Sequence, residues 1–181
     1  MEQRHDAIVT ILQFWFEAGN EKNWFAPPAE FDDLIRRQFG PLVDNALAGD
    51  LDDWQDTAQG ALALILLLDQ FTRNLHRNSP RAHDGDPKAR AVARISVVSG
   101  FDREWPLRER VFFYLPFGHS EDLADQDEAV RLAATLGNDM YLARARHYRD
   151  IIARFGRFPH RNDILGRQST ADERQFLDSG A

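Results

Sequence analysis

The sequence predicts an all-α protein that forms a single domain over residues 1–181. Apolar residues recur at helical spacing through nearly the whole chain, and no segment shows the strict alternation of a half-buried strand. Glycine, proline and capping side chains separate these apolar stripes, as they do at helix ends. Short connections favour antiparallel neighbours. The expected architecture is therefore seven or eight helices arranged as stacked antiparallel helical hairpins.

Each predicted helix follows from its own stripe. The first covers residues 6–18, with Asp6 as its cap. The second covers residues 31–47, and Gly40-Pro41 is expected to kink or split it because proline removes a helical donor. The third, 57–75, is apolar on most sides and is expected to be the most enclosed helix. The remaining predicted helices cover residues 86–99, 106–115, 120–136 and 140–155, and a short one follows the capping box Thr170-Ala171-Asp172-Glu173.

Composition excludes several classes of protein. The 181 residues include no cysteine, which rules out disulfides, thiolate metal sites and thiol nucleophiles. A net charge of −7 disfavours nucleic acid as a partner, because an acidic protein repels phosphates. The longest apolar run, 61–68, is far shorter than the about 20 residues of a membrane helix, and residues 1–6 do not resemble a signal peptide. The expectation is a cytoplasmic protein without membrane contact.

No cofactor or metal is expected. No glycine-rich stretch has the pattern of a dinucleotide or phosphate loop. The histidines and carboxylates around His83 and His119 do not have the spacing of a recognised metal site.

Three stretches place polar groups directly against apolar sequence. The first follows the central helix, where Asp69 and Arg73 are four residues apart, share a face and can pair. Asn74 comes next in the chain. One interpretation is that these residues form the polar wall of a pocket. The other is a purely structural ion pair at a helix end, since buried pairs also occur without function.

The second stretch, 112–122, runs from aromatic residues into Gly118 and a predicted helix start. His119 is a candidate general acid or base, because imidazole titrates near physiological pH. The alternative is that Ser120 caps the helix and His119 binds a buried backbone group. No Gly-x-Ser-x-Gly elbow supports a hydrolase.

The third stretch is a strongly basic loop. Residues 144–167 contain seven arginines and two aspartates, a net charge of +5, so the rest of the chain carries −12. Clustered guanidinium groups suit carboxylate or phosphate recognition, because the planar fork of arginine bonds both groups bidentately. Equally, these arginines can pair with acidic residues elsewhere and fasten the loop.

The same stretches resemble a known family, the bacterial proteins grouped as domain of unknown function 924. The resemblance is carried by Phe14-Trp15-Phe16 with Trp24-Phe25, by Leu67-Leu68-Asp69-Gln70-Phe71-x-Arg73-Asn74, by His119-Ser120-Glu121-Asp122, and by Arg154-Phe155-Gly156-Arg157-Phe158-Pro159-His160-Arg161-Asn162 with Leu165-Gly166-Arg167. It spans nearly the whole chain. The resemblance implies an all-helical, tetratricopeptide-like fold in a bacterial protein, and it brings no established activity.

The leading hypothesis is that the three polar stretches converge into one pocket for an anionic small molecule. If a reaction takes place there, His119 or His160 acts as acid or base and Glu121 sets its charge state. The first alternative is a tetratricopeptide-like interaction module that binds a protein partner without catalysis. The second is that the motifs serve only folding. Oligomeric state is not predicted. The candidate ligand-binding residues are Asp69, Arg73, Asn74, Ser120, Arg157, Arg161 and Asn162, and the candidate catalytic residues are His119, Glu121 and His160.

Overall fold

Helices joined by turns and loops make up residues 2–17, 19–24 and 27–180, which are the residues that the computed structural model describes. No strand occurs among them, which confirms the all-α fold. Phe25 of the second aromatic motif and Ala18, the predicted end of the first helix, lie outside these residues. The chain divides into two compact units, residues 1–77 with 81–116 and residues 78–80 with 117–181. One domain over residues 1–181 stays a prediction.

The first unit is built around a central helical segment. This segment consists of α3 (Ala58–Ile65), a π-helical turn (Leu66–Phe71) and α4 (Thr72–Leu75), which follow one another without a break. All side chains from residue 61 to residue 68 are fully buried. This confirms the prediction that 57–75 is the most enclosed helical segment. The other helices of this unit are α1 (Glu2–Phe16), α2 (Ala29–Ala48), α5 (Asp86–Ser99) and, up to Pro116, α6 (Leu107–Gly118).

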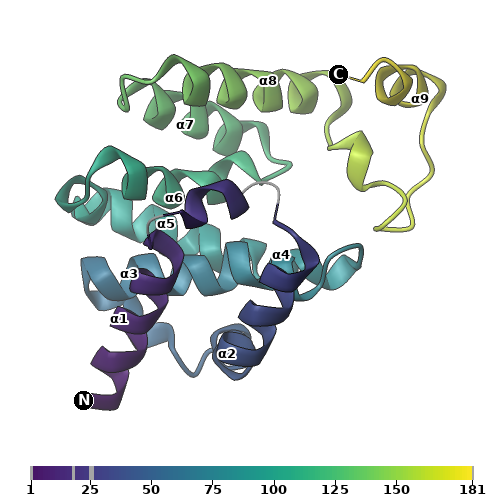
Figure 1. The fold of residues 1–181 in the computed structure, drawn as a ribbon. Coiled ribbons are helices and arrows are strands. Elements are labelled where there is room, and N and C mark those ends of the chain that lie inside the picture. The colour runs from purple at the N-terminus through teal and green to yellow at the C-terminus, as the bar shows by residue number, and fades with distance from the viewer. Residues whose placement is uncertain (1, 18, 25–26, 181) are drawn as a thin grey trace. The chain divides into compact units, whose positions relative to one another are not determined.

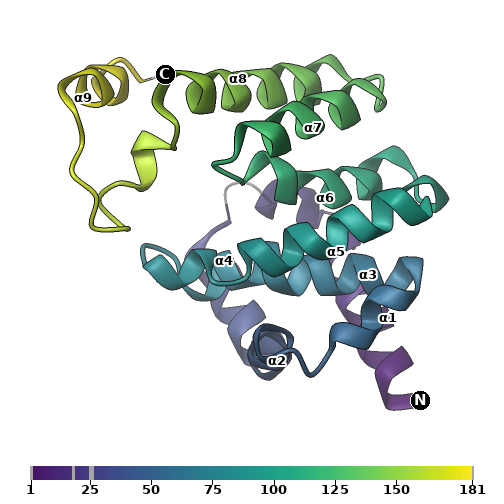
Figure 2. The same ribbon diagram turned by 180° about the vertical axis from the view of Figure 1, so that it is seen from behind.

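Helices α1 and α5 cover α3 from opposite sides, as Figures 1 and 2 both show. Aromatic rings fill the space where α1 and α6 meet the central segment. Trp15 packs on Phe71 with ring centroids 5.3 Å apart, and Trp24 meets Phe112 edge-on at 4.9 Å. The indole N–H of Trp24 donates to the Trp15 carbonyl at 2.9 Å. Packed aromatic pairs of this kind add about 0.5–1.5 kcal/mol each beyond the area they bury.

The second unit begins with a helical hairpin. Helices α7 (Leu123–Ala134) and α8 (Asp139–Phe155) lie side by side in both views and are joined by a four-residue connection, so they are antiparallel (Figures 1 and 2). Asn138 caps α8 by accepting from the amides of Met140 and Tyr141. This hairpin fits the predicted architecture and is compatible with a tetratricopeptide-like arrangement.

A loop and a short last helix complete the second unit. Gly156 ends α8 with a φ of 69°, a left-handed conformation that glycine adopts without strain. Beyond it, Phe158 packs with Ile151 and Ile152 in a small core. Helix α9 (Ala171–Asp178) starts with a capping box between Thr170 and Glu173, as the sequence predicted.

Several predicted helix boundaries were wrong. Asp6 is not a cap, because α1 already begins at Glu2. Pro41 does not split the second helix, because α2 continues through it; a kink at this residue stays a prediction. The cap of α7 is Asp122, whose side chain accepts from the Ala124 amide, and not Ser120. Local capping rules identify a suitable side chain but do not decide which of several neighbouring residues takes that position.

Candidate functional site

The first polar stretch forms a buried ion pair, as predicted. The Arg73 guanidinium donates to the Asp69 carboxylate at 2.8 Å and to the Asp69 carbonyl at 2.5 Å. Arg73 also lies 2.8 Å from the Asp86 carboxylate. The Asp69 side chain is only 1% exposed and that of Arg73 is 23% exposed. The pair therefore lies largely out of water, where loss of one partner is costly.

The backbone that carries Asp69 is a π-helix, which sequence periodicity did not predict. The Thr72 backbone N–H donates to the Leu67 carbonyl, five residues back rather than the four of an α-helix, and the Thr72 hydroxyl donates to the same carbonyl at 2.9 Å. The N-cap of α5, Gly85, lies so close to this turn that a Cβ there would be 2.1 Å from the Leu68 carbonyl oxygen. Single π-helical turns are uncommon and frequently occur at functional sites.

Asn74 is held by the same region of the first unit. Its side-chain amide donates to the Asp32 carboxylate of α2 at 2.6 Å, and Arg77 binds both oxygens of that carboxylate at 2.7 and 2.9 Å. Asp32 and Asn74 are both buried. Asp69, Arg73 and Asn74 therefore each bind a partner that fixes them to neighbouring elements of this unit.

In the second polar stretch, Ser120 and Glu121 connect to other parts of the second unit. The Ser120 hydroxyl donates to Asp125 at 2.7 Å and accepts from the Asp122 amide. Glu121 accepts from the Phe158 amide at 2.8 Å and from Arg167 at 2.7 and 3.0 Å. Burial raises the pKa of Glu121, but the hydrogen bonds from Arg167 and the Phe158 amide outweigh it and leave the pKa below its ordinary value.

Arg167 holds the ends of the basic loop together. Besides Glu121, its guanidinium donates to the Asn162 side-chain oxygen at 3.0 Å and to the Phe158 carbonyl at 3.1 Å. Asn162 is fully buried and donates to Ser169 at 3.0 Å. Arg167 belongs to the last sequence motif but was not among the predicted site residues.

Arg157 binds Glu173, the residue that also closes the capping box of α9. Two parallel hydrogen bonds of 2.6 and 2.8 Å join them, and Arg157 donates further to the Gln168 carbonyl at 2.9 Å. The Glu173 carboxylate also accepts from the Thr170 amide at 2.7 Å. The hydrogen bonds from Arg157, followed by the one from the Thr170 amide, lower the pKa of Glu173 to about 2.

His160 lies beside Phe158, and the backbone of His119 is linked to Phe158 through Arg161. The Arg161 guanidinium stacks on the Phe158 ring, 4.5 Å from its centroid, and donates to the His119 carbonyl at 3.0 Å. The His160 ring lies 5.3 Å from the Phe158 ring, and its side chain is exposed, whereas His119 is half-buried. Neither contact establishes a catalytic role, which stays a prediction for His119, His160 and Glu121.

A pocket of about 440 Å³ opens beside this network. It is lined by Arg157 and Glu173 together with Arg154, Phe155, Thr170 and Asp172. Arg154, which lies on the last turn of α8, places its guanidinium 4.6 Å from the centroid of the Phe155 ring. Arg154 opens the last sequence motif but was not among the predicted site residues, although its position three residues before Arg157 was an available signal.

The structure thus groups the predicted site residues in two sets. Asp69, Arg73 and Asn74 belong to the first unit. The second unit holds the other seven, and Glu121 and Asn162 meet there at Arg167; these seven are His119, Ser120, Glu121, Arg157, His160, Arg161 and Asn162. A common pocket for both sets stays a prediction. In the described part of the chain, no three His, Asp or Glu side chains are grouped so as to hold a metal ion. None of the helices described there has the length and apolar character to cross a bilayer.

The fold and this network define an all-helical protein with a basic C-terminal loop. Two arginines of this loop, Arg157 and Arg167, bind the carboxylates of Glu173 and Glu121. The chain belongs to a family of bacterial proteins of unknown function, DUF924, whose family model matches residues 11–181. It is also similar to a solved structure of a protein of unknown function from Agrobacterium tumefaciens. That similarity has 43% sequence identity and a TM-score of 0.92, and it covers 97% of this chain and 98% of the other. A comparison with curated proteins finds no match.

Proposed function

We propose that this protein binds an anionic small molecule in the pocket beside Arg154 and Arg157. The observation that carries the proposal is Arg154. Among the described residues its guanidinium contacts the Phe155 ring and forms no ion pair with a carboxylate. An arginine that lines a pocket without an acidic partner is available to bind a carboxylate or phosphate.

Arg157 adds donors of its own. Its contacts with Glu173 and Gln168 use the Nε and Nη2 groups. A guanidinium has five N–H donors, so those on Nη1 are not used by these bonds. The Thr170 hydroxyl, which also lines the pocket, accepts from the Glu173 amide and donates to the Glu173 carboxylate. Two side chains, those of Arg154 and Arg157, therefore offer unused hydrogen-bond donors to one ligand.

Two carboxylates, Glu173 and Asp172, also line the pocket, and their charges affect how strongly an anion binds there. Glu173 is neutralised by its bidentate pair with Arg157. Asp172 is exposed, forms no ion pair within the described residues, and repels an anion in the pocket. Asp172 is accordingly the residue whose neutralisation should tighten binding.

The test is titration calorimetry of the full chain with inorganic phosphate and with citrate, at constant ionic strength. Arg154→Gln should weaken binding about tenfold, the equivalent of one charge-assisted contact, and Asp172→Asn should strengthen it. Arg146→Gln is the matched control, because Arg146 is an exposed arginine two turns earlier on α8 that does not line the pocket. Absence of saturable binding for both anions, or equal affinity of Arg154→Gln and the wild type, would reject the site.

In a broader proposal, all the residues predicted from the sequence take part in ligand binding or proton transfer. In it, Asp69, Arg73 and Asn74 contribute to the same anion site, and His119 or His160 transfers a proton with Glu121 setting its charge state. The imidazole chemistry and the Arg161 contact with the His119 carbonyl support a role near the basic loop. Alanine substitution of Arg73 should then weaken anion binding as Arg154→Gln does. Unchanged affinity in a folded Arg73→Ala variant would restrict the site to the second unit.

A protein-interaction module without catalysis is the second candidate. The hairpin of α7 and α8 favours it, because Met140 at the start of α8 is 67% exposed. Exposed methionine adapts to varied apolar partners. Recovery of one stoichiometric partner by the wild type, and its loss with Met140→Asp, would support this function.

A further inference from the structure

The pocket beside Arg154 and Arg157 has a hydrogen-bond acceptor in addition to its donors. Asp172 lines it from the first turn of α9, and its side chain is exposed. Within the described part of the chain, this carboxylate forms no ion pair and no side-chain hydrogen bond. An ionised carboxylate only accepts hydrogen bonds, and its two oxygens offer about four positions to donors. A ligand that carries donors as well as negative charge therefore suits this lining better than a bare anion.

The two guanidinium groups of the pocket are held in place by their own contacts. The Arg154 guanidinium lies 4.6 Å from the centroid of the Phe155 ring, and this ring packs on Phe176 of α9 with centroids 5.1 Å apart. Two hydrogen bonds of 2.6 and 2.8 Å, from Nε and Nη2, hold Arg157 on Glu173. Side chains that are already ordered lose less entropy when a ligand binds. A phosphate monoester has three charged oxygens, enough to accept from both arginines at once.

Hydroxyl groups are better donors to Asp172 than an ammonium group is. Residues 154–174 contain five arginines and three acidic residues, a net charge of +2. This excess of positive charge repels a further cation, whereas a neutral hydroxyl donates to a carboxylate without that repulsion. Acidic side chains bind ribose hydroxyls in dinucleotide sites in the same way. Several hydroxyls along one carbon chain lie at different distances from a phosphate, so no single spacing between Asp172 and the arginines is required.

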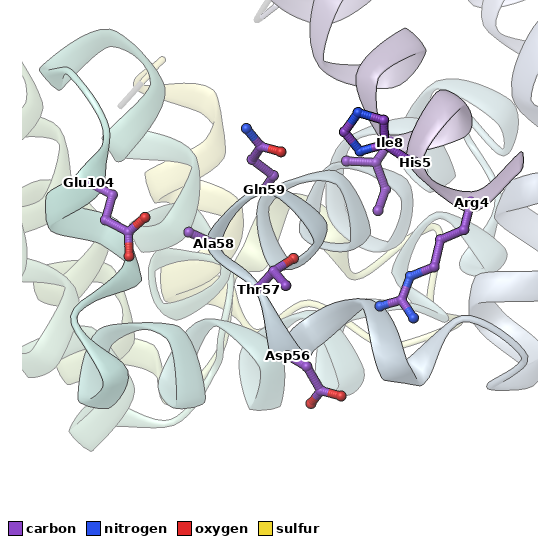
Figure 3. Close-up of a pocket in the computed structure, with 8 residues that line it drawn as sticks. All are labelled: Arg4, His5, Ile8, Asp56, Thr57, Ala58, Gln59 and Glu104. Atoms are coloured by element: carbon purple, nitrogen blue, oxygen red, sulfur yellow. The ribbon is translucent and has the colours of Figure 1, made fainter. Parts of the chain in front are cut away.

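The first unit also has a pocket, but its charges do not suit a phosphate. Its volume is about 580 Å³, and its lining includes two carboxylates, Asp56 and Glu104, and one guanidinium, Arg4 (Figure 3). The Arg4 guanidinium already pairs with the Asp53 carboxylate at 2.5 Å. Two carboxylates beside a neutralised arginine repel a doubly negative group. Of these two pockets, the one beside Arg154 is therefore the better site for a phosphate.

We propose that the pocket beside Arg154 binds a phosphorylated polyol, of which a sugar phosphate is the common form. Arg154 and Arg157 would bind the phosphate, and Asp172 would accept from the hydroxyl groups. The volume of about 440 Å³ is within the range of about 300–1,000 Å³ that small-molecule sites occupy. This inference rests on the proposed anion site and adds the class of its ligand.

The test is titration calorimetry of the full chain at pH 8 with D-glucose 6-phosphate and with ethyl phosphate, a monoester without hydroxyl groups. Both probes carry about two negative charges at this pH, because the second pKa of a phosphate monoester is about 6. D-glucose 6-phosphate should bind about tenfold more tightly, the equivalent of one hydrogen bond to a charged group. Equal affinities of the two phosphates would overturn the proposal. So would D-glucose that binds as tightly as D-glucose 6-phosphate.

Asp172→Ala locates the hydroxyl groups. Loss of this carboxylate ends its repulsion of the phosphate for both probes, whereas only D-glucose 6-phosphate loses an acceptor. The tenfold preference should therefore fall to about one, without loss of helical circular dichroism. Two controls should keep the preference, because each removes an exposed aspartate outside this pocket: Asp178→Ala at the other end of α9 and Asp56→Ala in the pocket of the first unit. An unchanged preference in Asp172→Ala, or an equal loss in a control, would reject the assignment.

The same measurements separate a failure of this inference from a failure of the proposed function. Inorganic phosphate that binds in an Arg154-dependent way, without a preference for D-glucose 6-phosphate over ethyl phosphate, would retain the anion site and reject the phosphorylated polyol. Absence of any Arg154-dependent binding would reject the anion site itself, and this inference with it.

Discussion

Replacement of Glu173 by glutamine tests the second-unit network most directly. The Glu173 side chain is 2% exposed and receives two hydrogen bonds from Arg157, which is 27% exposed, and one from the Thr170 amide. These contacts lower the pKa of Glu173 from its ordinary 4.5 to about 2. Because the folded-state pKa is the lower one, the ionised group stabilises the fold fully above pH 4.5. This contribution is lost as the pH falls toward 2.

The size of the effect follows from the same shift. One pKa unit corresponds to 1.36 kcal/mol, and the partial exposure of Arg157 reduces the full value, so Glu173→Gln should lower the free energy of unfolding at pH 7 by about 2–3 kcal/mol. Urea unfolding, followed by far-ultraviolet circular dichroism at pH 7, 4.5 and 3, measures it. The difference between variant and wild type should shrink as the pH falls below 4.5.

Glu128→Gln provides the control. Glu128 also forms a bidentate pair, with Arg131 at 2.6 and 2.7 Å, but the Arg131 side chain is 59% exposed. Exposed pairs contribute about 0–1 kcal/mol, so this variant should unfold nearly as the wild type does. A Glu173→Gln difference that stays constant from pH 7 to pH 3, or that equals the Glu128→Gln difference, would refute the reasoning.

Two further predictions concern the first unit. Arg73→Ala should lower the free energy of unfolding by about 3–5 kcal/mol, because it leaves the buried Asp69 and Asp86 carboxylates without their cation; a loss below 1 kcal/mol in urea unfolding would contradict this. Gly85→Ala should destabilise by about 1–3 kcal/mol, because its Cβ would meet the Leu68 carbonyl oxygen at 2.1 Å. A free energy of unfolding of Gly85→Ala equal to that of the wild type, measured by thermal unfolding, would contradict this.

Features that depend on neighbouring residues could be predicted from the sequence. The spacing of four between Asp69 and Arg73 predicted their ion pair, and the capping box of Thr170 and Glu173 forms as expected. The π-helical turn that carries Asp69 was not predictable from periodicity. A π-helical turn requires backbone hydrogen bonds between residues five apart instead of four. This segment is apolar on most sides, so its hydrophobic pattern does not reveal that shift.

The sequence by itself determined the helical class, the buried central segment and the presence of a basic loop. Periodicity, capping and composition are properties of residues that lie near one another in the chain. Only the tertiary structure decided which acids and arginines that lie far apart in the chain meet. Glu121 binds Arg167 and Asp32 binds Arg77 across 46 and 45 residues. A chain with 29 acidic and 22 basic residues allows many such pairs, and the packing of the helices selects among them.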